Sequence, residues 1–224
     1  MRRSRRTIQL LVGLFLFGIG LAFIVRGTLG VSPWDVLTLG ISQRLPLTFG
    51  TISVIVSFFV LLAWIPLRQK PGIGTVANAL LVGPSADIGL YLIPETDSLP
   101  MRIAYIALGI ALVGFATGLY IGSRFSPGPR DGLMTGLHRV TGRPIWIVRT
   151  VLEGSVVLLG WLLGGTVGVG TVAFALLIGP ICQYFMQIFY VTLPSDSGSN
   201  EGAHGIVDPH PEVVHNENPA TRSA

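Results

Sequence analysis

Long apolar runs without charge recur along the chain up to about residue 193. Residues 7–25 and 49–67 contain no charged side chain, and residues 101–123 contain only Arg102 near the start of the run. Each run is close to the roughly 20 residues that cross a bilayer as an α-helix. The pattern therefore predicts helices that span a membrane.

Three further apolar segments complete a set of six predicted spans. The six are residues 7–25, 49–67, 72–93, 101–123, 144–163 and 168–193. The composition agrees with this class, because half of the residues are hydrophobic and only 12% are charged, against about 25% in soluble domains. We therefore expect an all-α polytopic membrane protein embedded in a lipid bilayer.

One block of thirteen residues occurs twice in the apolar region. GIGTVANALLVGP begins at Gly72 and GVGTVAFALLIGP begins at Gly168, and ten of the thirteen positions are identical. The blocks differ most at Asn78, where the second copy has Phe174. A site that distinguishes the two copies is expected to begin at such a difference.

A second pair of related segments lies at the same spacing of 96 residues. SPWDVLTLG begins at Ser32, and GPRDGLMTG begins at Gly128. The membrane region therefore contains two copies of one unit. The expected domains are a basic N-terminus (1–6), a first membrane repeat (7–97), a second membrane repeat (98–193) and a tail (194–224).

The SPWD and GPRD segments are too short to cross a membrane. Residues 32–45 and 128–140 would each extend about 18 Å as a helix, whereas the hydrocarbon core of a bilayer is about 30 Å thick. Ser32 followed by Pro33 is typical of a helix start. Each segment is therefore predicted to form a short interfacial or re-entrant helix.

This interpretation leaves three spans in each unit, and an odd number inverts the second copy relative to the membrane. The expected fold is six transmembrane helices arranged as two inverted three-helix repeats, each with one short helix. That plan recurs among secondary transporters, where the substrate site lies near the middle of the membrane. Four spans in each unit would instead make the two copies parallel.

The distribution of positive residues predicts the orientation. With the N-terminus in the cytoplasm, ten arginine and lysine residues lie in cytoplasmic segments and three lie outside. This excess favours a cytoplasmic position for both termini. The sequence pI of about 9.7 then reflects topology rather than nucleic-acid binding. Residues 194–224 carry five acids and one arginine and lack aromatic residues, which predicts a disordered tail.

The duplicated G-x-G-T-x-A-x-A-L-x-x-G-P block, together with S-P-W-D and G-P-R-D-G-L-M, resembles the YitT/YczE family of bacterial integral membrane proteins. The resemblance covers residues 11–185. It implies a multi-pass protein of the bacterial plasma (inner) membrane. It implies no particular reaction, substrate or cofactor.

Each twin block ends in a Gly-Pro pair within a predicted span. Gly83 with Pro84 and Gly179 with Pro180 are expected to break or kink their helices. A break inside a bilayer is tolerated only against protein or a water-filled cavity, so these pairs are candidate cavity-lining breaks, with a packed kink as the alternative. GIGTVA and GVGTVA match the residue pattern of a dinucleotide-binding fingerprint. That fingerprint follows a strand, whereas each of these sequences begins an apolar span, so we do not expect nucleotide binding.

Ionisable residues within predicted spans are candidate site residues, because they are costly there. Asp87 lies three residues after Pro84, and Gln183 takes its place in the second unit. Arg149 and Glu153 are four residues apart on one helix face, the spacing of an ion pair. These four polar residues are the first candidates for a substrate-binding site, and a purely structural pair is the alternative for Arg149 and Glu153.

A second group of candidates flanks the two short helices. Arg26 precedes the first and Arg124 precedes the second, while Asp35 and Asp131 take equivalent positions inside them. Either the two acids only cap their helices, or the arginines Arg26, Arg124 and Arg130 and the helix starts form paired electropositive mouths that suit an anion or a carboxylate.

The sequence offers no constellation for catalysis or metal binding. His138 is the single histidine of the membrane region, and Cys182 is the single cysteine. We therefore expect no enzyme activity, metal or cofactor. Glycines spaced four apart (Gly114, Gly118 and Gly122) permit close helix packing or a homodimer face. The leading hypothesis is a small-solute transporter or channel, and the alternative is a non-transporting scaffold or accessory protein that binds a protein partner.

Overall fold

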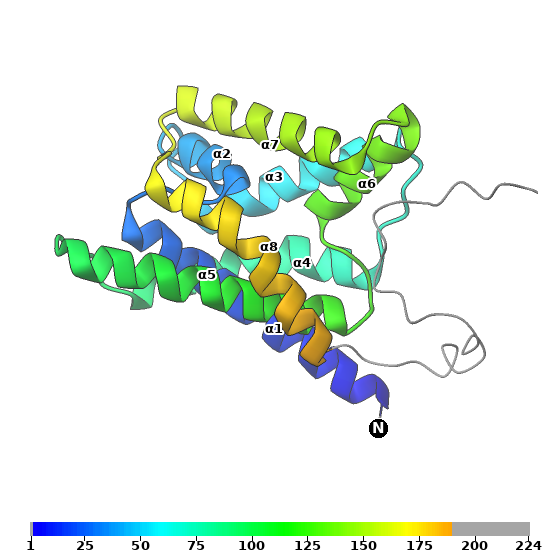
Figure 1. Ribbon diagram of the computed structural model, residues 1–224, viewed down its shortest axis with the longest axis horizontal. Helices are drawn as coiled ribbons and strands as arrows, with labels where there is room; N and C mark the ends of the chain where they lie inside the picture. Colours follow the sequence, from blue (N-terminus) through cyan, green and yellow to red (C-terminus); the bar gives the residue numbers. More distant parts are fainter. Residues whose placement is uncertain (1, 190–224) are drawn as a thin grey trace, which may run out of the picture. The chain divides into compact units, whose positions relative to one another are not determined.

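Residues 2–189 of the chain are described by a computed structural model, in which they form eight helices within one compact unit (Figure 1). The predicted tail, residues 194–224, lies outside the described residues. The helices are α1 (Arg2–Gly27), α2 (Pro33–Ser42), α3 (Phe49–Trp64), α4 (Ile73–Leu92), α5 (Leu99–Gly122), α6 (Pro129–Thr141), α7 (Ile145–Leu162) and α8 (Val169–Phe189).

The prediction of an all-helical membrane protein is confirmed at this level. Five helices, α1, α4, α5, α7 and α8, are long and apolar enough to cross a membrane. The sixth predicted span, α3, is an apolar helix of 16 residues and is shorter than expected. It ends at Trp64, two residues before Pro66, which has no backbone N–H to continue the helical hydrogen bonds. Both predicted short helices are present, as α2 and α6.

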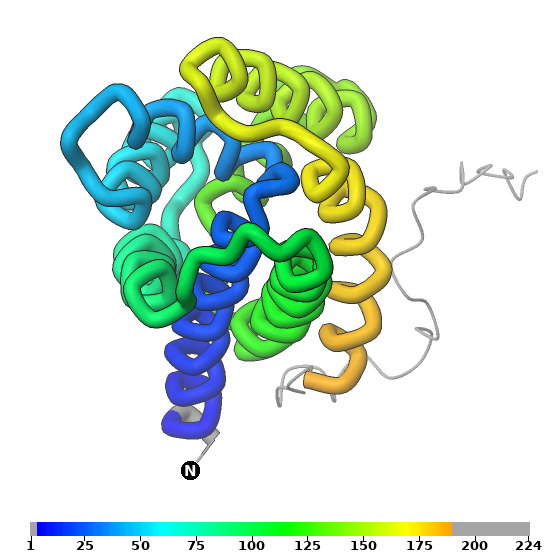
Figure 2. The backbone as a smooth tube through the Cα atoms, turned by 90° about the vertical axis from the view of Figure 1, so that its left-hand side faces the viewer, coloured from blue at the N-terminus to red at the C-terminus, as the bar shows by residue number. Residues whose placement is uncertain are grey.

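The eight helices form two groups, each around its own apolar core. One core lies mainly among α1, α4, α5 and α8, and the other lies among α2, α3, α6 and α7. Helix α1 packs along both α4 and α5, and α5 also packs along α8. Figure 2 shows α4 and α8 on opposite sides of the α1–α5 pair. In Figure 1, α2 and α6 lie toward opposite ends of α3 and α7.

Each short helix packs on a long helix from the opposite half of the chain. Helix α2 packs on α7, where a Cβ added to Gly40 would collide with the carbonyl oxygen of Gly160. Helix α6 packs on α3, where a Cβ on Gly132 would collide with the Trp64 ring. The Trp64 indole also donates a hydrogen bond to the Pro129 carbonyl at 3.0 Å. The two halves are therefore interlocked through their short helices.

The threonine of each twin block helps to start its own helix. The Gly72 N–H donates to Thr75 Oγ1 at 3.4 Å, and the Gly168 N–H donates to Thr171 Oγ1 at 3.3 Å. Both threonines are buried. The first amides of a helix lack partners within the helix, so the G-x-G-T sequence supplies one locally in each copy.

The same blocks also form hydrogen bonds with the loop that precedes the short helix of the opposite half. Thr75 donates through its backbone N–H to Ser126 Oγ at 2.8 Å and through its hydroxyl to the Pro127 carbonyl at 2.8 Å. In the other copy, the Gly170 N–H donates to the Leu29 carbonyl at 2.8 Å. This reciprocal contact is a physical reason for the duplicated sequence.

The expected helix breaks at the Gly-Pro pairs are not present. Helix α4 continues through Gly83 and Pro84, and α8 continues through Gly179 and Pro180. The φ angle of proline, about −65°, is compatible with a helix, although a proline removes the hydrogen bond to the carbonyl four residues earlier and crowds that carbonyl. The remaining bonds hold each helix together across the pair.

The two Gly-Pro pairs have different surroundings. Gly83 lies against α3, where an added Cβ would collide with the carbonyl oxygen of Gly50, whereas a Cβ on Gly179 would meet nothing within 4 Å. Among the described helices, α3 packs along α4, but α7 makes no comparable contact with α8. The first half is therefore closed along α3 and α4, and the second half is open at the corresponding place.

We predict opposite effects of alanine at the two equivalent glycines. Gly83→Ala forces a methyl group against backbone and should destabilise the fold by about 1–3 kcal/mol. Gly179→Ala meets open space and should leave stability unchanged or raise it by up to about 1 kcal/mol, because alanine favours a helix. Thermal unfolding of both purified variants in detergent measures the difference. Equal shifts in Tm would contradict the closed and open arrangement.

Candidate functional site

An ion pair joins the first turns of the two short helices. Arg130 of α6 places Nη2 3.3 Å from Oδ1 of Asp35 in α2. Asp35 belongs to the S-P-W-D segment of the first half, and Arg130 belongs to the G-P-R-D segment of the second. The packing of each short helix on the opposite half therefore brings the two related motifs together.

Asp35 is held from both sides. Its side chain is only 1% exposed, and its second carboxylate oxygen accepts a hydrogen bond from the Ser32 hydroxyl. The Arg130 guanidinium also lies 5.3 Å from the centre of the Trp34 ring, within range of a cation–π interaction. A buried carboxylate needs such partners, because its desolvation is costly. Asp35 thus forms a charge contact between the halves in addition to lying in the first turn of α2.

The equivalent acid of the second half, Asp131, meets residues from two long helices. The Tyr120 hydroxyl of α5 donates to Asp131 Oδ2 at 3.4 Å. A Cβ placed on Gly128 would lie 3.4 Å from Asp131 Oδ2 and 3.5 Å from Nδ2 of Asn78 in α4. Gly128 thus leaves room for three polar groups to converge. We call the polar set at these two helix starts the junction, which consists of Ser32, Asn78, Asp35, Tyr120, Arg130 and Asp131.

The two acids of the junction differ in accessibility. Asp131 is exposed, whereas Asp35 is buried. The junction therefore combines a buried, paired carboxylate with an accessible one.

Arg149 and Glu153 form the ion pair that their spacing predicts. Arg149 Nε lies 2.9 Å from Glu153 Oε1 on α7. The Arg149 side chain is 54% exposed, and the residue lies in the second turn of α7, near the helix end. An arginine at such a place can extend toward the membrane surface.

Asp87 and Gln183 occupy unlike environments. Asp87 of α4 accepts hydrogen bonds from Thr48 Oγ1 at 2.6 Å and from the Gly50 N–H at 2.7 Å, so it caps the first turn of α3. Gln183 is exposed on α8. No hydrogen bond described for this part of the chain joins either residue to Arg149. The four residues expected to share one site are therefore not assembled into one, and Asp87 has a clear structural role.

The arginines that precede the short helices have partners other than Asp35 and Asp131. Arg26 forms an ion pair with Glu95. Arg124 lies in the loop after α5 with a φ of +55°, and its carbonyl accepts a hydrogen bond from Arg6 Nη2 at 2.9 Å. Arg26 and Arg130 are both paired with carboxylates, so the two expected electropositive mouths carry balanced charge at these residues.

Sequence reasoning found part of the junction and missed the rest. It identified Asp35, Arg130 and Asp131, and it marked Asn78 as a point of difference between the copies. It did not predict the pairing across the two halves, and nothing in the local sequence singled out Tyr120. Among the described residues, no group of three or more histidine, cysteine or acidic side chains could hold a metal ion.

Comparison with known proteins assigns the chain to a family. The model of a family of unknown function, DUF6198, matches residues 4–187. The chain belongs to this family. No solved structure matches it.

Three bacterial relatives cover most of the chain. An uncharacterised protein of Haemophilus influenzae is 41% identical over 82% of this chain and 84% of its own length. The uncharacterised membrane protein YczE of Bacillus subtilis is 30% identical over 77% of this chain and 81% of its own. The uncharacterised protein YyaS of the same organism is 28% identical over 79% and 90%, respectively. The resemblance to the YczE family is thus confirmed, and the DUF6198 chain is a multi-pass membrane protein.

We predict that the ion pair between the short helices contributes to stability. Arg130→Gln leaves Asp35 buried without its charged partner and should cost about 3 kcal/mol, because breaking a buried pair leaves an uncompensated charge. The double variant Asp35→Asn with Arg130→Gln should cost less than the sum of the single changes. Unfolding in detergent measures all three.

The exposed pair on α7 supplies the matched control for this prediction. Arg149→Gln should cost no more than about 1 kcal/mol, because exposed ion pairs contribute little. Additive effects of Asp35→Asn and Arg130→Gln, or losses no larger than that of Arg149→Gln, would contradict a stabilising contact between the halves.

Proposed function

We propose that this DUF6198 protein is a small-solute transporter or channel of the bacterial inner membrane and that its substrate site is the junction. The observation that carries the proposal is the ion pair between Asp35 and Arg130, one from each half, in a bundle built on two apolar cores. Charged residues at such a place are costly and commonly mark a substrate or ion pathway.

The packing of the helices supports the finer plan of two inverted repeats with six spans. Helix α1 packs on α4 as α5 packs on α8, and α2 packs on α7 as α6 packs on α3. Paired contacts of this kind are expected when two copies are related by a two-fold axis, and three spans in each copy would place that axis in the membrane plane. Helix α3 would be the sixth span, because its 16 residues extend about 24 Å and a short span is accommodated by local thinning of the bilayer.

The chemistry of the junction suits a small polar solute. Asp131 offers an accessible carboxylate, Tyr120 offers a hydroxyl, and Asn78 offers an amide, all near the start of α6. Short helices that begin next to a site also direct their backbone N–H groups toward it. Such groups can replace the water molecules of a polar solute, which is the requirement for carrying it through an apolar layer.

Chemical labelling of single introduced cysteines tests the topology on which this proposal depends. In a Cys182→Ser background, cysteine at Asp97 should react with an impermeant maleimide from outside intact cells. Cysteine at Arg68 or Arg139 should react only after the cells are permeabilised. All three positions are exposed. Labelling of positions 97 and 139 from the same side would contradict the inverted arrangement.

Flux into proteoliposomes tests the function and the site. The panel consists of glycerol, urea, acetate, lactate and succinate, and light scattering follows reswelling after a hyperosmotic challenge. At least one solute should enter faster than into protein-free vesicles. Asp131→Asn should slow that entry by about tenfold or more, which corresponds to the loss of one contact of about 1.4 kcal/mol.

Arg139→Gln is the matched control for the flux measurement, because Arg139 is exposed near the other end of the same helix. It should leave flux unchanged. Equal flux through Asp131→Asn and the native protein would exclude the junction as the site. If no solute in the panel enters faster than into protein-free vesicles, the transport proposal fails and an accessory membrane protein becomes the favoured function.

A further inference from the structure

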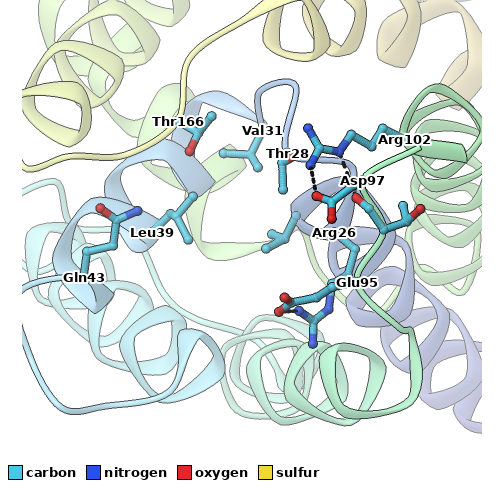
Figure 3. Close-up of a pocket in the computed structure, with 11 residues that line it drawn as sticks. Arg26, Thr28, Val31, Leu39, Gln43, Glu95, Asp97, Arg102 and Thr166 are labelled. Carbon is cyan, nitrogen blue, oxygen red and sulfur yellow. Dashed lines mark hydrogen bonds and ion pairs between the residues drawn. The ribbon is translucent and has the colours of Figure 1, made fainter. Parts of the chain in front are cut away.

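A cavity of about 320 Å³ lies between the end of α1, the start of α5, the short helix α2 and the loops that join α4 to α5 and α7 to α8. It is separate from the junction, since none of the six junction residues lines it. Its walls carry four charged side chains, Arg26, Glu95, Asp97 and Arg102, which form two ion pairs. Figure 3 shows both pairs on one side of the cavity.

The positive and negative members of these two pairs differ in how far they are exposed. The arginines belong to helices and are mostly covered, with side chains that are 22% exposed for Arg26 and 30% for Arg102. The acids belong to the loop between α4 and α5, where Glu95 is 83% exposed and Asp97 is fully exposed. The fixed charges beside the cavity are therefore positive, and the negative charges that neutralise them come from an exposed loop.

The Arg26 guanidinium retains an unused donor. Its Nη1 pairs with Glu95 and its Nη2 donates to the Leu90 carbonyl, but its Nε is buried without a hydrogen-bond partner in the described part of the chain. A buried donor without a partner is unfavourable. A guanidinium binds carboxylates readily, so this arginine can present Nη1 to the carboxylate of a solute in place of Glu95.

We propose that this cavity binds a small organic carboxylate through Arg26 and Arg102, and that Glu95 and Asp97 occupy these arginines when the solute is absent. The exposed loop carboxylates offer the same chemical group that an incoming solute would offer. Exposed ion pairs are weak, so the two acids can be displaced at little cost. The loop thereby acts as a competing internal ligand.

The rest of the cavity fits the same class of ligand. Thr28, Gln43 and Thr166 supply neutral polar groups, while Val31 and Leu39 supply apolar surface for a short carbon chain. A volume of this size is at the lower end of the range for small-molecule sites. These residues come from both halves of the chain, as they do at the junction.

The inference does not depend on transport, because binding can be measured on the full chain in detergent without any flux. The probe is succinate, and the matched control is succinamide, which has the same carbon skeleton and no charge. Isothermal titration of the purified native protein should give saturable heat with succinate and none with succinamide.

Two groups of variants separate the arginines from the loop acids. Arg26→Gln and Arg102→Gln should each weaken succinate binding at least about tenfold, the loss expected for one charged contact. The double variant Glu95→Gln with Asp97→Asn should bind succinate roughly three- to fivefold more tightly, because it removes the competing carboxylates. Glu95 and Asp97 are exposed, so this second variant tests the proposal even if an arginine variant unfolds.

The succinate titrations distinguish support for the proposal from its failure. Saturable binding that is tightened by the loop variant supports the proposal, and so does binding that becomes detectable only in that variant. The absence of succinate binding in both proteins overturns it. Equal binding of succinamide, or retained affinity in folded Arg26→Gln and Arg102→Gln, also overturns it, because the arginines would then not recognise a carboxylate.

Discussion

The rest of the structure depends on how the amide and carbonyl groups of the non-helical backbone between the long helices find hydrogen-bond partners. In a membrane protein, the amide and carbonyl groups of such a loop must find partners within the protein, because lipid offers none. The Leu29 carbonyl, after α1, accepts from Gly170, and the Pro127 carbonyl, after α5, accepts from Thr75. Each donor belongs to the opposite half of the chain. Neither half therefore completes the hydrogen bonds of its own loop.

This reciprocal contact also determines where the charges lie. Once the loop of each half is held by the other, α2 packs on α7 and α6 packs on α3. Their first turns are then close enough for Arg130 to reach Asp35. The glycines at these crossings, such as Gly40 and Gly132, allow the approach because a side chain there would collide with its neighbour. The polar junction is thus a consequence of the way in which the two halves interlock.

The two halves are not equivalent in detail, and they differ in the packing of α3 and α4 in the first half and of α7 and α8 in the second. Asp87 caps α3 and Gly83 packs against it, which closes the first half. In the second half, Gln183 is exposed and Gly179 faces open space. The two related acids differ as well, because Asp131 is exposed while its counterpart Asp35 is buried. The glycines whose spacing predicts close helix packing, Gly114, Gly118 and Gly122, pack against α8 within the chain.

The sequence by itself determined the membrane class, the positions of the helices and the duplication, because these depend on local composition and periodicity. It also predicted the Arg149–Glu153 pair, since two residues four apart on one helix are neighbours whatever the fold. The tertiary structure alone decided the partners of Asp35, Arg26 and Asp87. The charged partner of Asp35 lies on another helix, that of Arg26 lies in the loop between α4 and α5, and the partners of Asp87 lie at the start of α3, so their distances depend on the tertiary packing. No local pattern encodes that arrangement, because it arises from loops whose hydrogen bonds are completed only by the opposite half.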